Sequence, residues 1–282
     1  MTSVAERRAR FRELHASEGI FVMPNPWDVG SARLLASLGF EALATTSAGF
    51  AWSLGRLDQR VTRDELVAHV GELTAAIDLP LNVDSEHCFP GEPGGVAETV
   101  AQLAAAGAAG CSIEDYDPVN DRIEELDVAV ERVAAAAVAA HELPEPMVLT
   151  GRAENHLRGV QDLDDTIRRL VAYRDAGADA VYAPGLTDLG QIGALVRAVE
   201  IPVNVLVLPG GPTVAELAPV GVRRISTGSL LAAAAYAALV EEAERLQTDG
   251  AAPATSDLVS RKALAAAFGA ETAPTREPPA SG

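Results

Sequence analysis

The sequence of 282 residues predicts a (β/α)₈ barrel of the TIM type, followed by an extra C-terminal helix. Short apolar or β-branched runs alternate with longer alanine-rich helical patterns, and this alternation repeats about eight times. The short runs are apolar on both faces, which is typical of buried parallel strands. Eight such units in about 230 residues favour a closed barrel over an open doubly wound sheet.

The expected strands and helices follow one another regularly along the chain. We expect the strands at Ile20–Pro24, Ala42–Thr46, Leu81–Asp84, Cys111–Glu114, Met147–Gly151, Ala180–Ala183, Val203–Val207 and Arg224–Thr227. We expect helices at Arg63–Ile77, Val96–Ala106, Leu126–Ala140, Leu163–Ala176, Leu189–Val199 and Leu230–Arg245. Glycines such as Gly107 and Gly177 separate several helices from the next strand, and glycine ends a helix at low cost because it adopts the left-handed conformation. These glycines between helices and strands support the barrel interpretation.

The end of the chain has a different composition. We assign residues 1–247 to the barrel, and residues 248–282 to a linker, a C-terminal helix and a disordered tail. The helix is expected at Asp257–Phe268, with Ser256 or Asp257 as its cap. A helix joined to the barrel by a linker either packs on its own subunit or exchanges with a neighbouring one.

Composition excludes several classes of protein. Lys and Arg total 22 against 40 Asp and Glu, so the formal net charge is −18, which disfavours nucleic acids and anionic membranes as partners. Two cysteines exclude a disulfide scaffold or a four-cysteine zinc site, and we expect a reducing, cytoplasmic environment. No signal peptide is recognisable, and no apolar run reaches about 18 residues. An anionic substrate would therefore need a local cation, an arginine or helix N-termini.

Acidic residues gather where the third and fourth strands are expected to end. Asp84 and Glu86 are two residues apart and share a face of an extended strand, while Glu114 lies at the same level on the next strand. Three converging carboxylates repel one another unless a cation lies between them. Their oxygen ligands favour Mg²⁺, or Mn²⁺, over zinc. The alternative is that these acids only cap the helices that follow.

Two further features stand at the same end of the expected barrel. Arg152, after the fifth strand, either neutralises the acidic cluster or binds a substrate carboxylate, and it can do both. The turn after the second strand, Thr45–Phe50, is rich in small and hydroxyl residues that could donate to an anion, or it is an ordinary turn. Asp58 follows in the same loop, where a single aspartate is most often a cap or solvated.

Together these segments resemble the isocitrate lyase/phosphoenolpyruvate mutase superfamily. The matching segments are Asn25-Pro26-Trp27-Asp28, Thr46-Ser47-Ala48-Gly49, Asp58, Asp84-Ser85-Glu86, Glu114-Asp115 and Gly151-Arg152-Ala153-Glu154. They occur in order within a resemblance that runs from about Phe21 to Leu239, nearly the whole expected barrel.

The resemblance implies a set of roles for these residues. It implies Mg²⁺ held near Asp84, Glu86 and Glu114, partly through water, and it places Asp58 beside the reacting group. It also implies homodimers or homotetramers that commonly exchange their eighth helix. The substrate, a small anionic metabolite, is expected to meet Trp27, Thr46, Ser47, Ala48, Gly49, Asp84, Asn120, Arg152 and Glu154.

Two departures from the family pattern bear on the reaction. Isocitrate and methylisocitrate lyases carry a Lys-Lys/Arg-Cys-Gly-His segment after the fourth strand, whereas Asp115–Asp121 has no Cys, Lys or His here. The mutases carry a histidine after the sixth strand, where this chain has Ala183-Pro184-Gly185. The broader branch, which acts on oxaloacetate or substituted malates and is often labelled carboxyvinyl-carboxyphosphonate phosphorylmutase-like, fits better.

From this resemblance we expect a Mg²⁺-dependent lyase that cleaves a carbon–carbon bond of a small 2-oxo or 2-hydroxy dicarboxylate through a pyruvate-type enolate. The alternatives are a carbon–phosphorus enzyme of the phosphonopyruvate mutase or hydrolase type, and a non-catalytic barrel that binds a metabolite. Tyr116, His87 and Cys88 are candidate proton donors. Each also has an ordinary role, as a lid aromatic, a loop residue and a small buried hydrophobe respectively.

Overall fold

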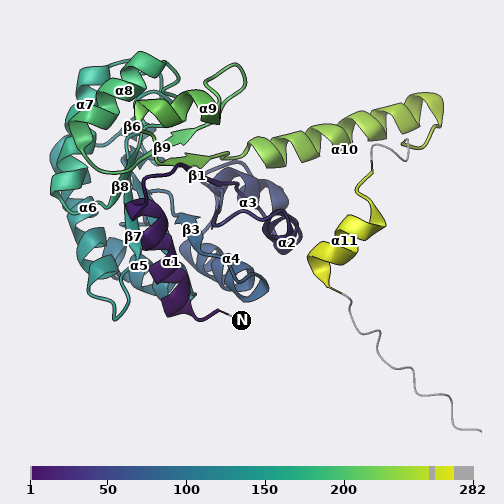
Figure 1. The fold of residues 1–282 in the computed structure, drawn as a ribbon, viewed down its shortest axis with the longest axis horizontal. Helices are drawn as coiled ribbons and strands as arrows, with labels where there is room; N and C mark the ends of the chain where they lie inside the picture. The colour runs from purple at the N-terminus through teal and green to yellow at the C-terminus, as the bar shows by residue number, and fades with distance from the viewer. Residues whose placement is uncertain (1, 254–257, 270–282) are drawn as a thin grey trace, which may run out of the picture.

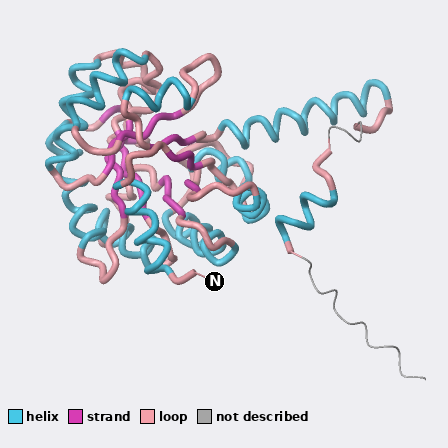
Figure 2. Tube along the Cα trace, viewed as in Figure 1, coloured by secondary structure: helices cyan, strands magenta, loops and turns pink. Residues whose placement is uncertain are grey.

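Eight parallel strands form a nearly closed barrel in the computed structural model, which describes residues 2–253 and 258–269 (Figures 1 and 2). The strands are β1 (Phe21–Met23), β2 (Leu43–Ala44), β3 (Leu81–Asp84), β4 (Gly110–Glu114), β7 (Val148–Arg152), β8 (Ala180–Tyr182), β9 (Val203–Leu206) and β10 (Arg224–Ser226). Their order in the sheet is β1-β10-β9-β8-β7-β4-β3-β2. The predicted fold class is confirmed, and each predicted strand lies within two residues of an observed one.

The ring of strands closes between β1 and β2 without a regular ladder. The Ala44 N–H donates to the Pro24 carbonyl oxygen across this seam, at 3.2 Å. Just beyond β1, the Asn25 amide spans both sides: its Nδ2 donates to the Thr45 carbonyl at 2.7 Å, and its Oδ1 accepts from the Thr227 N–H at 2.8 Å. A buried side chain therefore completes the closure at the carboxyl end of the strands.

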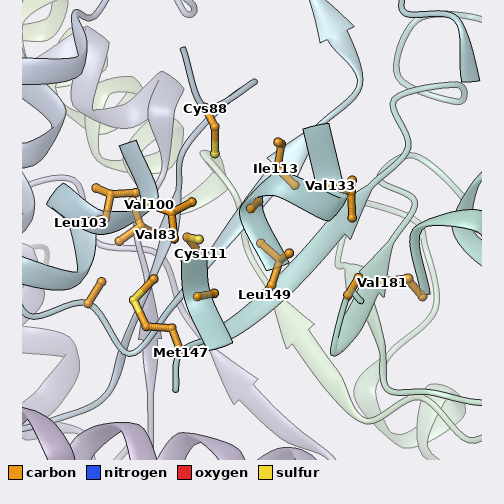
Figure 3. Close-up of a cluster of buried hydrophobic side chains, with 14 of the residues drawn as sticks. Val83, Cys88, Val100, Leu103, Cys111, Ile113, Val133, Met147, Leu149 and Val181 are labelled. Atoms are coloured by element: carbon orange, nitrogen blue, oxygen red, sulfur yellow. The ribbon is translucent and has the colours of Figure 1, made fainter. Parts of the chain in front are cut away.

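Helices surround the barrel between successive strands. They are α2 (Val29–Ser37), α3 (Ser47–Ser53), α4 (Arg63–Ala76), α5 (Gly95–Ala105), α6 (Leu126–His141), α7 (Leu163–Asp175), α8 (Leu189–Val199), α9 (Val214–Leu217) and a short 3₁₀ turn at Ala218–Val220. The apolar faces of strands and helices form one core, in which Val83, Cys111 and Leu149 of neighbouring strands belong with Leu103 of α5 and Val133 of α6 (Figure 3).

A helix before the first strand covers the amino end of the barrel. In α1 (Val4–Ala16), Phe11 and Leu14 join a buried cluster with Met23 of β1. The guanidinium of Arg8 donates to the carbonyls of Ala104, in the last turn of α5, and of Ala108, just before β4, at 2.7 and 2.9 Å. This end of the barrel is therefore closed by α1, and access to its interior is from the carboxyl ends of the strands.

The last two helices lie outside the ring of helices that surrounds the strands. Helix α10 (Leu230–Asp249) extends away from it, and α11 (Arg261–Phe268) returns toward α2, which it contacts (Figure 1). Helix α11 begins at Arg261 with Ser260 as its N-cap, so the predicted start at residue 257 is wrong by four residues. The predicted caps Ser256 and Asp257 lie outside the described residues. None of the helices described is long and apolar enough to span a membrane.

Candidate active site

Three carboxylates hold Arg152 at the carboxyl end of the barrel. Arg152 ends β7 and is paired in register with Glu114, the last residue of β4. Its Nη1 lies 3.2 Å from Asp84 Oδ1 and 3.3 Å from Glu114 Oε2, and its Nε donates to Glu154 Oε1 at 2.6 Å. Burial opposes the charge, but Glu154, Glu114 and Asp84 outweigh it and raise the pKa of Arg152 well above its usual value. The guanidinium is thus fixed in position and charged.

The predicted hydroxyl-rich turn is the start of a helix that faces the same aspartate. Thr46 is the N-cap of α3 and accepts from the Gly49 N–H at 3.2 Å. Ser47 donates to Asp84 Oδ2 from its backbone N–H at 3.1 Å and from its hydroxyl at 3.0 Å. A Cβ on Gly49 would lie 2.6 Å from Thr46 Cγ2 and 3.1 Å from Trp27 Cβ, so only glycine allows this close approach.

The rim holds more carboxyl groups than basic groups. Burial, reinforced by Asp84 and Asp58, raises the pKa of Glu86 to about 8, and burial followed by Asp84 raises the pKa of Asp58. Burial also raises the pKa of Glu114 well above its usual value, against the effect of Arg152. The carboxyl groups of Asp58, Asp84, Glu86 and Glu114 therefore lie close together with one arginine, Arg152, an arrangement that favours the binding of a cation.

The donor set at this rim suits a hard divalent cation. Glu86 is 4% exposed, and Gln59 donates from Nε2 to Glu114 Oε1 at 2.8 Å while its own buried Oε1 has no partner. Mg²⁺ takes oxygen ligands, usually one or two carboxylates together with waters. Within residues 2–253 and 258–269, no group of three His, Cys, Asp or Glu side chains is already arranged around a metal position. The assignment of Asp84, Glu86 and Glu114 as ligands stays a prediction.

A cavity of about 140 Å³ opens beside this rim and extends into the barrel. Six of the predicted site residues line it, namely Thr46, Ser47, Ala48, Asp58, Asp84 and Arg152. Polar strand residues that were not among the predicted site residues also line it, namely Asn82, Ser112, Tyr182, Asn204, Arg224 and Ser226. These residues could have been found from the sequence, because they are polar residues within strands that are otherwise apolar.

The remaining predicted residues do not line this cavity. Glu154 is fully buried and joins Arg152 to Arg158, whose Nε lies 3.1 Å from Glu154 Oε2. Asn120 donates to Asp117 Oδ2 at 2.6 Å within an exposed turn. This turn joins β5 (Tyr116–Asp117) to β6 (Arg122–Ile123), a small antiparallel hairpin that the sequence reading did not predict.

The three candidate proton donors have different surroundings. Tyr116 lines a hollow of about 470 Å³ together with Asp58, beneath the Arg158 guanidinium, whose Cζ is 3.4 Å from the ring centroid. His87 packs against Phe89, and its pKa is lowered by burial and then by Arg132. Cys88 is fully buried, and burial raises the pKa of its thiol to about 12. Tyr116 alone of the three faces a hollow shared with Asp58.

Comparison with known proteins decides the family. The family model for phosphoenolpyruvate phosphomutase matches residues 11–247. The chain belongs to the isocitrate lyase/phosphoenolpyruvate mutase superfamily. The superfamily resemblance seen in the sequence is thereby confirmed, and the members it resembles are lyases or mutases.

Individual superfamily members agree over most of the chain. A structure from Burkholderia cenocepacia J2315, described only as a lyase/mutase, is 49% identical, covers 95% of this chain and 97% of its own, and has a TM-score of 0.90. An oxaloacetate decarboxylase of Paraburkholderia xenovorans is 34% identical over 79% of this chain and 75% of its own length. A Corynebacterium glutamicum protein named "Probable 2-methylisocitrate lyase 2" is 34% identical over 76% of this chain and 70% of its own.

Proposed function

We propose that this superfamily member is a Mg²⁺-dependent lyase that cleaves a carbon–carbon bond of a small 2-oxo or 2-hydroxy dicarboxylate. The observation that carries the proposal is the rim itself, where Arg152 and Ser47 converge on Asp84 beside a cavity of about 140 Å³. Such a site can hold a 2-oxo acid and stabilise the enolate left when the bond breaks. The names of the relatives support this choice, because decarboxylation of oxaloacetate breaks a carbon–carbon bond.

The acidic residues would hold the cation and the neighbouring donors would hold the substrate. Asp84, Glu86 and Glu114 would bind Mg²⁺, or Mn²⁺, directly or through water. When bound, the ion supplies Lewis-acid charge next to the 2-oxo group. Arg152 donates to a substrate carboxylate and to the developing enolate oxygen, and its three carboxylate contacts keep its fork from rotating. Ser47 offers its hydroxyl and backbone N–H on the facing side.

Tyr116 is the residue to which we assign proton transfer to the enolate. Its hydroxyl donates to Asp121 Oδ1 at 2.6 Å, and this hydrogen bond, followed by burial, raises its pKa, so the phenol is protonated at neutral pH. Asp58 lies between the cavity and the hollow that Tyr116 lines, and would border the bond that breaks. The Tyr116→Phe variant should lose turnover while it retains substrate binding.

The substrate class is tested with purified protein and a substrate panel. Oxaloacetate, substituted malates and phosphonopyruvate are incubated with MgCl₂, and the formation of pyruvate and of phosphoenolpyruvate is measured with and without EDTA. We expect turnover of a dicarboxylate that requires the metal. Turnover of phosphonopyruvate alone would assign carbon–phosphorus chemistry instead. Binding of these compounds without any turnover would assign a non-catalytic metabolite-binding barrel.

Metal binding is tested separately by titration calorimetry with MgCl₂. Asp84→Asn removes charge at the rim and should weaken binding by about 10-fold or more. Asp64→Asn removes the same charge from an exposed position on α4 and should bind as the wild type does. Equal affinity of Asp84→Asn and the wild type would contradict the metal assignment.

Helix α10 supports a proposal about assembly. Ala232 is its only buried residue, while Leu239, Val240 and Leu246 are more than half exposed. We propose a homodimer or homotetramer that buries this surface, with exchange of the C-terminal helical segment between subunits. Gel filtration coupled to light scattering tests the proposed assembly, since a monomer at micromolar concentration would contradict it.

Both cysteines are free and buried, which fits the cytoplasm as the proposed compartment.

A further inference from the structure

A second arginine lies inside the barrel, at the closed end of the cavity. Arg224, the first residue of β10, is 2% exposed and lines the cavity floor. Its Nε donates to Asn204 Oδ1 at 3.0 Å, and its Nη1 lies 3.0 Å from His15 Nε2. Since His15 Nδ1 lies 2.7 Å from the Phe11 carbonyl, to which it donates, Nε2 is the acceptor from Arg224.

These contacts are all with neutral groups. Burial, followed by Arg224, lowers the pKa of His15 to about 3, so the imidazole carries no charge at neutral pH. Burial lowers the pKa of Arg224 to about 10, so the guanidinium remains protonated. Among the ion pairs of the described residues, Arg152 has three carboxylate partners within 4 Å and Arg224 has none. The cavity floor therefore carries an uncompensated positive charge.

An isolated buried charge is costly, and the site around Arg224 is otherwise polar. An ion that is moved from water into a protein interior without a partner loses its hydration, and this is costly for a cation and for an anion alike. Asn82, Ser112 and Ser226 line the same cavity with an amide group and hydroxyls. Such a pocket suits an oxyanion better than an apolar group.

We propose that the floor of the cavity is a binding subsite for a small carboxylate anion, with Arg224 as its counter-charge. The remaining N–H donors of Arg224 match the two oxygens of a carboxylate. The occupant can come from two sources, a free anion of the size of formate or a carboxylate of the substrate. The second source rests on the proposed lyase function, and the first does not.

The subsite is tested without substrate, on the full chain stripped of metal with EDTA. Its melting temperature is measured against sodium formate, with the ionic strength held constant by the bulky sulfonate MES. We expect a saturable rise of about 2 to 4 °C when formate reaches about five times its dissociation constant. Arg224→Met should abolish this rise. Arg223→Met, the matched change at the neighbouring arginine that does not line the cavity, should retain it.

A second measurement covers the case in which Arg224→Met does not fold. Wild-type crystals grown in sodium formate should show the anion within hydrogen-bond distance of the Arg224 guanidinium, and crystals soaked in sodium bromide should show an anomalous peak there. A wild-type melting temperature that follows ionic strength alone, with no anion at Arg224, would overturn the proposal.

Inhibition kinetics then distinguish the two sources. A substrate carboxylate would be identified as the occupant by two results together. Formate would compete with a dicarboxylate that the protein turns over, and Arg224→Met would raise the KM for that dicarboxylate at least 10-fold. Inhibition or activation that does not compete would identify a free anion. If the substrate panel shows no turnover at all, the proposed lyase function fails while the formate measurement still decides the subsite.

Discussion

His15 is expected to make the fold sensitive to mild acid. It lies under the barrel between Phe11 and Arg224, and its pKa is lowered from 6.5 to about 3, chiefly by burial. The unfolded chain therefore binds a proton between about pH 6.5 and pH 3 that the folded chain does not. Because the folded-state pKa lies below the unfolded value, the contribution of His15 to the free energy of unfolding is complete above pH 6.5. It is lost as the pH falls through this window.

The size of the effect follows from the width of the window. Each pH unit below the unfolded pKa costs about 1.4 kcal/mol, so a change from pH 7 to pH 5 should remove about 2 kcal/mol through His15 alone. His15→Gln removes the titration, and its side-chain oxygen can still accept from Arg224. The variant should therefore lose about 2 kcal/mol less than the wild type over the same change in pH.

Urea unfolding at pH 7, 6 and 5 measures this difference. The midpoint and slope give the free energy of unfolding at each pH for both proteins. His69, whose pKa is lowered to about 4 mainly by burial, and His87 are present in both proteins, so their contributions cancel in the comparison. If the two proteins lost the same free energy from pH 7 to pH 5, the neutral, buried state of His15 would be refuted.

Three substitutions test other parts of the molecule. Arg152→Lys keeps the charge but loses the fork that contacts three carboxylates, and should lower kcat/KM by about 100-fold or more while the far-UV circular dichroism is unchanged. Gly110→Ala would place a Cβ 2.7 Å from the Val148 carbonyl oxygen, and should destabilise the fold by about 1 to 3 kcal/mol in urea unfolding. Tyr173→Phe removes the 2.6 Å hydrogen bond to the buried Asp115, and should lower the free energy of unfolding by about 1 to 3 kcal/mol in the same measurement. An unchanged urea midpoint would contradict this prediction.

The strands could be predicted because buried parallel strands leave a clear pattern. Leu81–Asp84 was placed with its observed bounds, and helix α8 was predicted exactly as observed, because an apolar run and capping residues mark their ends. Helix α11 was placed too early because its cap is Ser260, one of several serine and aspartate residues in that segment that could serve as a cap. Cap identity depends on the backbone conformation, which composition does not encode.

The site could be predicted only to the level of residue types at strand ends. That Arg152 pairs with Asp84, Glu114 and Glu154 is a matter of side-chain direction, which no spacing fixes. The hairpin at Tyr116–Ile123 depends on Asp121, which adopts a φ of 49° that aspartate tolerates better than most residues. Gln59 was missed because a single glutamine in a loop carries no distinctive spacing, and only the fold brings its amide to Glu114.

The way in which the barrel closes affects its mouth. Between β1 and β2 the ring of strands is held by hydrogen bonds from the Ala44 N–H and from the Asn25 amide. The other neighbouring strands are paired in regular ladders. The β1–β2 contact has no regular ladder, so we expect the ring of strands to open there first. Thr45, which accepts from Asn25, leads directly into Ser47 and its contact with Asp84. We therefore expect hydrogen exchange at the amides of Thr45 and Ser47 to be faster than at the amides of β7, which ends at Arg152.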